Sequence, residues 1–179
     1  TTDVVVRNGY TQFATKAGQA ESLMTYGGAT GQKLIVAIGS SFYDATAGGA
    51  LGAAVVAGLT NGRWEYINVS TTGGNYLYAV NGTDAPELFD GTTWQAVTGV
   101  SAPISITGVT TTLLKNVNLF KNRVWFIEKN SLRAWFLPLS SVGGAASSLD
   151  FSSIARRGGN LVAMGTWTID AGYGVDDLA

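Results

Sequence analysis

Cysteine and histidine are both absent from the 179 residues of the chain. Without cysteine, the chain can form no disulfide framework and no thiolate metal site. Without histidine, it can hold neither a Ser-His-Asp triad, nor a Cys-His pair, nor a histidine-ligated metal. The enzyme classes that stay open need paired carboxylates, as in glycoside hydrolysis, or a reactive lysine.

The acidic residues give little support to those remaining classes. Asp44 and Asp90 recur at equivalent places of a repeat, which is typical of a turn hydrogen bond rather than of a catalytic acid. Residues 81–87 lack the alternating Asp/Asn spacing of a calcium loop and read as an exposed hairpin tip. We therefore predict no catalytic residue, no cofactor and no metal site, and expect a protein that is not an enzyme. A carboxylate glycosidase stays open only as a third class of function.

Charged side chains are also scarce, at 13% of the chain, which is about half of the share typical of soluble domains. The formal net charge of −1 gives no overall basic character of the kind that marks nucleic-acid-binding domains. No run of apolar residues approaches the length of a membrane-spanning helix. An uncharged surface rich in Gly, Ala, Ser and Thr suits a protein that is packed among partners.

Residues 115–157 differ from the nearly neutral chain as a whole, because they hold seven basic and two acidic side chains. Ordinary solvated strand faces are the simpler interpretation of this stretch. The sharper hypothesis is contact with DNA or with a partner protein, for which a pair of arginines can meet a phosphate or a carboxylate. The candidate residues for that contact are Lys121, Arg123, Lys129, Arg133, Arg156 and Arg157.

A strand-like run, a tight turn and an aromatic-led second run occur three times, in residues 33–44, 76–90 and 123–136. Tyr43 precedes Phe89 by 46 positions, and Phe89 precedes Trp135 by 46 again. A fixed period of about 40–50 residues made of strands is typical of stacked or radial blades. The repeat therefore predicts an all-β fold, a β-propeller-like array of antiparallel units.

Short apolar runs lead into the three copies at residues 22–24, 67–69 and 117–119, and a fourth such run stands at residues 161–164. The spacing predicts a further strand near position 177. We expect residues 1–179 to form a single β-propeller-like domain with three complete units and part of a fourth. Because both ends of the chain read as strands, we also expect a longer polypeptide of which this is a part.

The tryptophans follow the period of the repeat. Packing between neighbouring sheets is the favoured interpretation, because a large ring fills the wedge between adjacent blades. A platform on which sugar rings stack is the alternative. The residues concerned are Trp64, Trp94, Trp125, Trp135 and Trp167.

Three segments, residues 3–10, 118–138 and 165–179, resemble a family of bacteriophage and prophage proteins. The most specific part is the Phe-Lys-Asn-Arg-Val-Trp-Phe stretch at residues 120–126. Members of this family are virion components of the tail or of the head-to-tail connection, of the kind called tail hub, nozzle or packaged-DNA stabilisation protein. The resemblance implies a β-propeller-like body, a non-enzymatic structural role and no catalytic residues.

The same resemblance implies a location and partners. It places the protein in the virion tail after synthesis in the cytoplasm of the bacterial host. The partners would be portal, adaptor or tail components, further copies of the chain and, non-specifically, packaged DNA, with no membrane involved. The alternative function is a carbohydrate-binding, receptor-recognising β module in which Trp and Tyr side chains stack on sugar rings.

Overall fold

The computed structural model describes residues 9–28, 31–169 and 175–178. Strands dominate these ranges, and the one helical element in them is a short 3-10 turn, η1 (Thr111–Leu113). None of the described helical structure has the length or the apolar character that a bilayer crossing requires. The all-β class expected from the sequence is confirmed.

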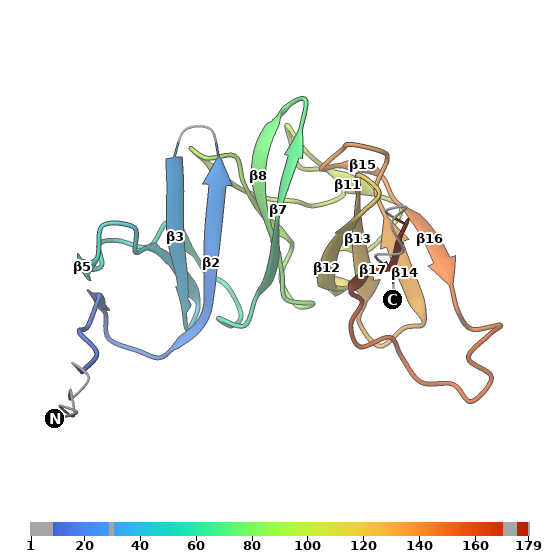
Figure 1. The fold of residues 1–179 in the computed structure, drawn as a ribbon, viewed down its shortest axis with the longest axis horizontal. Helices are drawn as coiled ribbons and strands as arrows, with labels where there is room; N and C mark the ends of the chain where they lie inside the picture. The colour runs from blue at the N-terminus through green and yellow to red at the C-terminus, as the bar shows by residue number, and fades with distance from the viewer. Residues whose placement is uncertain (1–8, 29–30, 170–174, 179) are drawn as a thin grey trace, which may run out of the picture.

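The main strands form three four-stranded antiparallel sheets, each of which meanders from one strand to the next. Sheet 1 consists of β2 (Ala20–Gly28), β3 (Gly31–Ile38), β4 (Ser41–Asp44) and β6 (Val56–Ala57). Sheet 2 consists of β7 (Glu65–Thr71), β8 (Gly74–Val80), β9 (Glu87–Phe89) and β10 (Trp94–Ala96). Sheet 3 consists of β12 (Leu114–Phe120), β13 (Arg123–Glu128), β14 (Arg133–Phe136) and β16 (Ser147–Asp150). Figure 1 shows the sheets side by side in sequence order, from blue to orange.

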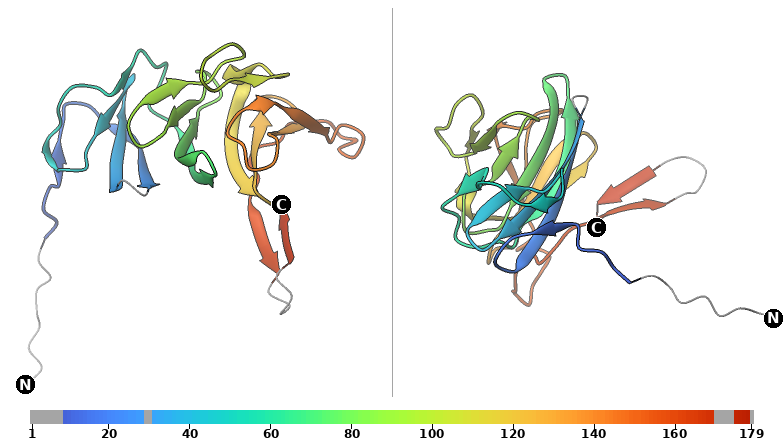
Figure 2. Two further views of the ribbon diagram at one scale, coloured as in Figure 1. Left: turned by 90° about the horizontal axis from the view of Figure 1, so that it is seen from above. Right: turned by 90° about the vertical axis from the view of Figure 1, so that its left-hand side faces the viewer.

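Shorter elements complete the fold. Two parallel pairs of strands join distant loops, namely β1 (Ala14–Thr15) with β5 (Gly49–Ala50) and β11 (Ile106–Thr107) with β15 (Gly144–Ala145). A final antiparallel pair, β17 (Thr166–Ile169) and β18 (Val175–Leu178), lies beside β12 and extends away from the row of sheets (Figure 2). Within the described ranges, no sheet closes on itself.

The sequence explains the tight hairpin between β12 and β13. Lys121 and Asn122 form its two-residue turn with φ values of 47° and 57°. Positive φ at both central residues is the requirement of a type I′ turn, whose twist matches that of the strands that it joins. Asn tolerates this left-handed conformation better than most residues.

The face that sheets 2 and 3 turn toward the preceding sheet, and the corresponding face of sheet 1, is here called the front face; the opposite face of each sheet is its rear face. This division follows from the alternation of side chains along a strand. The rear face of sheet 1 carries Met24, Ile35 and Phe42, which pack against Leu77 and Phe89 of the front face of sheet 2. All five side chains are buried, and burial of each is worth about 1.5–3 kcal/mol.

A second core joins sheets 2 and 3 in the same manner. Tyr78 and Leu88 on the rear face of sheet 2 pack with Val124, Phe126 and Leu137 on the front face of sheet 3. The ring centroids of Tyr78 and Phe126 are 5.5 Å apart. Hydrophobic burial therefore holds the three sheets together as one row.

The residues of the 46-residue spacing occupy equivalent places, as the repeat predicts. Each lies on the third strand of its sheet, on the front face, opposite an apolar residue of the second strand. The cross-strand pairs are Val36 with Tyr43, Leu77 with Phe89, and Phe126 with Trp135.

The fourth apolar run differs in structure from the three runs that precede it, which lie on strands β2, β7 and β12. Residues 161–164 form no strand, and the chain first becomes extended and paired at β17, Thr166–Ile169. The physical reason is that side-chain amides and loop carbonyls, rather than a neighbouring strand, take up the backbone polar groups of this segment. The strand expected near position 177 is confirmed as β18.

Three of the tryptophans pack between sheets, from places that are not equivalent in the repeat. Trp64 and Trp94 belong to the core between sheets 1 and 2, and Trp135 packs on the core between sheets 2 and 3. Trp125 pairs with Asn118 and Phe136 and so lies on the rear face of sheet 3. The side chain of Trp167 lies outside the described part of the structure.

Candidate functional site at the junctions between sheets

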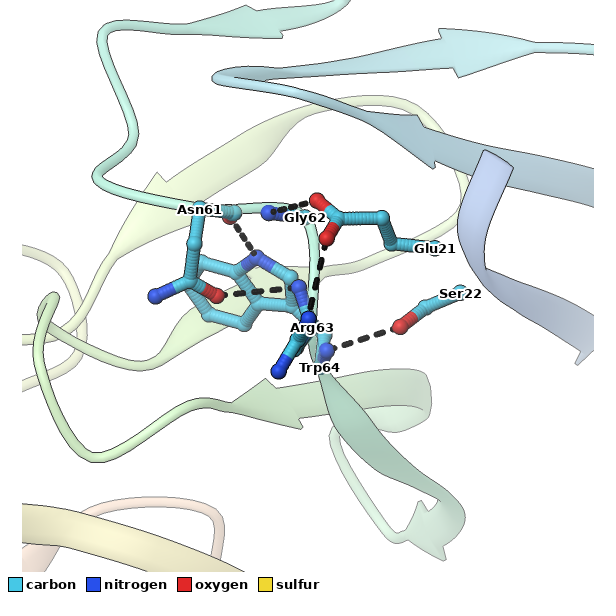
Figure 3. A network of polar contacts seen from close by, with 6 residues as sticks. All are labelled: Glu21, Ser22, Asn61, Gly62, Arg63 and Trp64. Atoms are coloured by element: carbon cyan, nitrogen blue, oxygen red, sulfur yellow. Dashed lines mark hydrogen bonds and ion pairs between the residues drawn. The ribbon is translucent and has the colours of Figure 1, made fainter. Parts of the chain in front are cut away.

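Polar contacts tie the start of sheet 2 to strand β2 of sheet 1 (Figure 3). The Glu21 carboxylate accepts hydrogen bonds from the Gly62 backbone N–H at 3.0 Å and from Arg63 Nε at 3.3 Å. The Ser22 hydroxyl accepts another from the Trp64 backbone N–H at 2.8 Å. These contacts join residues 41 or 42 positions apart, so no local pattern in the sequence marks them.

Trp64 is the aromatic centre of this first junction. Its indole Nε1–H donates to the Asn61 carbonyl oxygen at 2.8 Å, which satisfies the ring's only polar atom. The ring meets Phe42 edge to face, with centroids 5.0 Å apart and planes at 81°. Such pairs add about 0.5–1.5 kcal/mol to the effect of burial, so Trp64 locks the chain that enters sheet 2 against sheet 1.

At the same junction the side chain of Asn68 binds the backbone of β2, a contact called here the Asn68 clamp. Asn68 Nδ2 donates to the Thr25 carbonyl oxygen at 2.7 Å, and the Gly27 N–H donates to Asn68 Oδ1 at 3.2 Å. Strand β2 is an edge strand of its sheet, so its outer backbone groups lack a strand partner. The side chain of Asn68 supplies both a donor and an acceptor to that edge.

The junction between sheets 2 and 3 depends on the loop between β8 and β9. The Gly82 N–H donates to the Leu114 carbonyl oxygen at 2.9 Å, and Lys129 Nζ donates to the Gly82 carbonyl oxygen at 3.0 Å. Gly82 has a φ of +69°, and a Cβ there would lie 2.9 Å from Lys115 Cβ. Glycine is therefore required both for the backbone conformation and for the close approach of the two sheets. Asn116 Nδ2 also donates to the Glu65 carboxylate.

Asparagine side chains again hold the chain that follows sheet 3. The Met164 N–H donates to Asn116 Oδ1 at 3.3 Å, and Asn118 Nδ2 donates to the Met164 carbonyl oxygen at 3.1 Å. This arrangement resembles the clamp of Asn68 on β2, with the asparagines now on the rear face rather than the front face. Each of the two junctions between sheets thus combines an apolar core with hydrogen bonds from polar side chains.

One buried carboxyl stands out beside the first junction. Glu87 is 6% exposed, and desolvation, with a smaller contribution from the charge of Asp84, raises the pKa of its carboxyl to about 7. Desolvation would raise the pKa of Asp84 as well, but hydrogen bonds from Thr60 and Asn81 outweigh it and lower that pKa. Asp84 therefore stays ionised and engaged with the loop, while Glu87 titrates near neutral pH.

The loop of residues 81–87, weighed as a calcium site from the sequence, is closed by its own hydrogen bonds. Asn81 Oδ1 accepts from the N–H groups of Thr83 and Asp84 at 2.9 and 2.8 Å. Among the residues that the structure describes, no three Asp or Glu side chains gather into a possible metal site. The loop serves as a turn and as a contact to neighbouring sheets.

The six candidate basic residues divide between the two ends of sheet 3. Lys121 and Arg123 lie at the turn between β12 and β13, at the beginning of β13. Lys129 and Arg133 lie beyond the other end of that strand, and Arg156 and Arg157 follow β16, whose last residue is Asp150. The structure therefore does not bring all six side chains to one place.

Three of these six side chains are engaged within the protein. Arg123 Nη1 donates to the Leu137 carbonyl oxygen at 3.0 Å, and Lys129 holds the Gly82 loop. Arg133 forms an ion pair with Asp150 at 3.3 Å. The side chains of Lys121, Arg156 and Arg157 are exposed and make no hydrogen bond or ion pair with any described residue.

One surface groove lies where residues of all three sheets meet in the described part of the chain. It has a volume of about 330 Å³ and carries Arg63, Glu65 and Lys115 among its lining residues. Its charges have both signs, Arg63 is already paired with Glu21, and Glu65 accepts from Asn116. The contacts at this groove can hold neighbouring sheets in register, and their geometry provides no acid–base pair.

The described tryptophan side chains also make their contacts with other residues of the protein. Trp94 stacks on Phe89 with centroids 4.9 Å apart, and Trp125 lies 4.7 Å from Phe136. Trp135 Nε1 donates to the Glu128 carboxylate at 3.0 Å. These contacts serve packing and do not assemble an open platform for a sugar ring.

Comparisons of the chain with protein-family models, with curated proteins and with solved structures find no match.

Proposed function

We propose that this chain is a non-enzymatic structural component of a bacteriophage virion, in the tail or in the head-to-tail connection. In this proposal the three sheets are blades of a β-propeller-like array that assembles with portal, adaptor or tail proteins. The resemblance of residues 118–138 to phage tail proteins supplies the functional class.

The observation that carries a structural role is the use of polar side chains at the junctions between sheets. Glu21, Ser22, Asn68 and Asn116 all bind groups of a neighbouring sheet or segment rather than facing a common cleft. A row of sheets that pack against one another, with few charged residues, suits a part that is held among other proteins.

Co-purification tests the proposal. The chain, carried in its full-length protein with an affinity tag, is recovered from cells that produce the phage, and the bound proteins are identified. We expect portal or tail components in stoichiometric amounts. Recovery without them, together with binding of the purified chain to glycans, would support the carbohydrate-binding alternative and contradict the virion role.

Contact with packaged DNA is a separate part of the proposal, and the exposed pair Arg156 and Arg157 is its best candidate. Because phosphate contacts release counterions, the affinity for duplex DNA must fall as the salt concentration rises. We expect the Arg156→Ala/Arg157→Ala variant to bind duplex DNA more weakly at every salt concentration and to show a shallower salt dependence by about two phosphate contacts.

The matched control is Arg133→Ala, because Arg133 is engaged with Asp150. Negligible, salt-insensitive DNA binding by the unmodified protein would remove this part of the proposal and leave the structural role untouched.

A further inference from the structure

We propose that the segment between β16 and β17 is a cleavage site for endopeptidases of the trypsin class, which cut the folded protein after Arg156 or Arg157. The inference goes beyond the proposed virion role and does not depend on it, because it rests on the backbone and side chains of this segment. The reaction is hydrolysis of one peptide bond, in which a water supplies a hydroxyl to the arginine carbonyl carbon and a proton to the nitrogen of the next residue.

The backbone of this segment is held by local contacts. Residues 151–165 form no strand, and the described backbone hydrogen bonds of residues 152–160 stay within the segment. The Ala155 N–H donates to the Phe151 carbonyl oxygen at 2.8 Å, and the Gly158 N–H donates to the Ala155 carbonyl oxygen at 3.0 Å. Opening of such a stretch takes little free energy compared with global unfolding, because no pair of strands has to separate.

Both ends of the segment are fixed to the turn between β13 and β14. The Phe151 N–H donates to the Leu132 carbonyl oxygen at 3.0 Å, and the Leu161 N–H donates to the Ser131 carbonyl oxygen at 2.9 Å. Figure 1 shows the chain between these points as a loop that leaves the end of β16 and extends away from sheet 3. A protease can therefore take hold of the loop without displacing a strand of the sheet.

The side chains of the loop suit this class of enzyme. Arg156 and Arg157 are exposed near its middle, and the two glycines that follow them are exposed as well. Small and polar residues at exposed loop tips are the preferred sites of proteolytic nicking. A trypsin-class protease holds the side chain that precedes the cut in a pocket with a carboxylate at its base, and the arginine guanidinium supplies the matching positive charge. The loop thus combines the backbone and the side chain that such an enzyme needs.

The other basic residues of the described ranges lack this combination. Lys121 is exposed, but it belongs to the two-residue turn between β12 and β13. An extended substrate conformation there would require the hydrogen-bonded pairs of these strands to separate first. The remaining basic side chains lie on strands or hydrogen-bond to another segment, as Lys129 does to the Gly82 carbonyl oxygen. We therefore expect one preferred cleavage site in the described ranges.

The piece of chain that follows the cut keeps its contacts with sheet 3. Asn116 and Asn118 bind the backbone of Met164, and β17 and β18 lie beside β12. Hydrolysis after Arg156 or Arg157 removes none of these contacts, because Met164 and both strands lie beyond the cut. The cleaved protein should therefore stay together until it is unfolded.

Digestion of the purified chain with trypsin under native conditions, followed by intact-mass spectrometry, tests the proposal. We expect the first cut within the described ranges to fall after Arg156 or Arg157, and the two fragments to elute together in gel filtration and apart in urea. The Arg156→Gln/Arg157→Gln variant should be cut within these ranges at least about tenfold more slowly, because its remaining sites open only when strand pairs separate.

Lys121→Gln is the matched control, because it removes an exposed basic side chain from a paired hairpin; this variant should be cut as fast as the unmodified chain. Circular dichroism of each variant verifies that it is folded. A first cut elsewhere in the described ranges, or cleavage of the double variant at the unmodified rate, would overturn the proposal. Fragments that separate without urea would contradict the retention of the C-terminal piece. None of these outcomes bears on whether the protein is found in virions.

Discussion

At the scale of single residues, the least expected features are polar atoms that are buried without a partner. The Tyr78 hydroxyl lies in the core between sheets 2 and 3 and makes no hydrogen bond with any residue that the structure describes. Burial raises the pKa of this hydroxyl far above its usual value, so it stays protonated. Its desolvation is an uncompensated cost of folding.

The first prediction concerns this hydroxyl. Tyr78→Phe removes a group that is hydrated in the unfolded chain and unsatisfied in the folded one, so we expect the free energy of unfolding to stay unchanged or to rise by about 1 kcal/mol. Tyr78→Ala, which also removes the ring, should lower it by about 3–5 kcal/mol. Urea denaturation measures both changes. A loss of stability in Tyr78→Phe as large as that in Tyr78→Ala would contradict the assignment.

The second prediction concerns Glu87, whose pKa is raised to about 7 by burial and by Asp84. A raised carboxyl pKa means that the folded state holds the proton more tightly than the unfolded state does. The stability associated with Glu87 is therefore fully present below about pH 4.5 and is lost as the pH rises through 7. The loss amounts to about 3 kcal/mol at most, at about 1.4 kcal/mol for each pH unit between the two pKa values.

Glu87→Gln tests this dependence, because the amide has a similar shape and no charge. The difference in unfolding free energy between Glu87→Gln and the unmodified chain should grow in favour of the variant between pH 5 and pH 8. Asp84→Asn is the informative comparison, since it removes the neighbouring charge while leaving Glu87 in place. A difference that does not change with pH would show that Glu87 does not titrate in this range.

At the scale of elements, the inner hairpins follow directly from the sequence. Alternating apolar and aromatic residues with a turn between them identify β3 with β4 and β13 with β14, and these strands appear where the period places them. The outer strand β6 has only the residues Val56 and Ala57 inside a Gly- and Ala-rich stretch, so no alternation marks it.

The parallel strand pairs and the contacts at the junctions could not be predicted from local sequence patterns, because they join segments that are distant along the chain. Ala14 pairs with Gly49, and the Asn68 clamp joins residues 41 and 43 positions apart. The burial of Glu87 likewise follows from how sheets meet and not from its neighbours in the sequence. The sequence shows that residues 115–157 are basic. Only the strand register in the structure shows that the basic residues are divided between the two ends of β13.

The third prediction concerns the first junction, where two contacts of different kinds are available for comparison. Ser22→Ala leaves the backbone N–H of the buried Trp64 unpaired, so we expect it to lower the unfolding free energy by about 1–3 kcal/mol. Arg63→Ala removes an ion pair whose arginine side chain is 84% exposed, and the expected loss is below about 1 kcal/mol. Thermal or urea unfolding of the two variants gives the comparison, and a larger loss in Arg63→Ala would contradict it.

At the scale of the whole molecule, the chain is a row of sheets that repeats one mode of contact. At both junctions the front face of one sheet meets the rear face of the preceding sheet through an apolar core, and polar side chains fix the register of the junction. Stability is therefore distributed along the row, as in other repeat architectures, where each unit contacts mainly its neighbours.

The virion role is tested most directly by labelling intact phage particles. Antibodies raised against the purified chain, coupled to gold, are applied to virions and viewed by electron microscopy, with particles from an unrelated phage as the control. The proposed function predicts label at the tail or at the head-to-tail connection of each particle. Virions that carry no label, while the chain is abundant elsewhere in the producing cells, would contradict the proposal that this protein is a structural part of the virion.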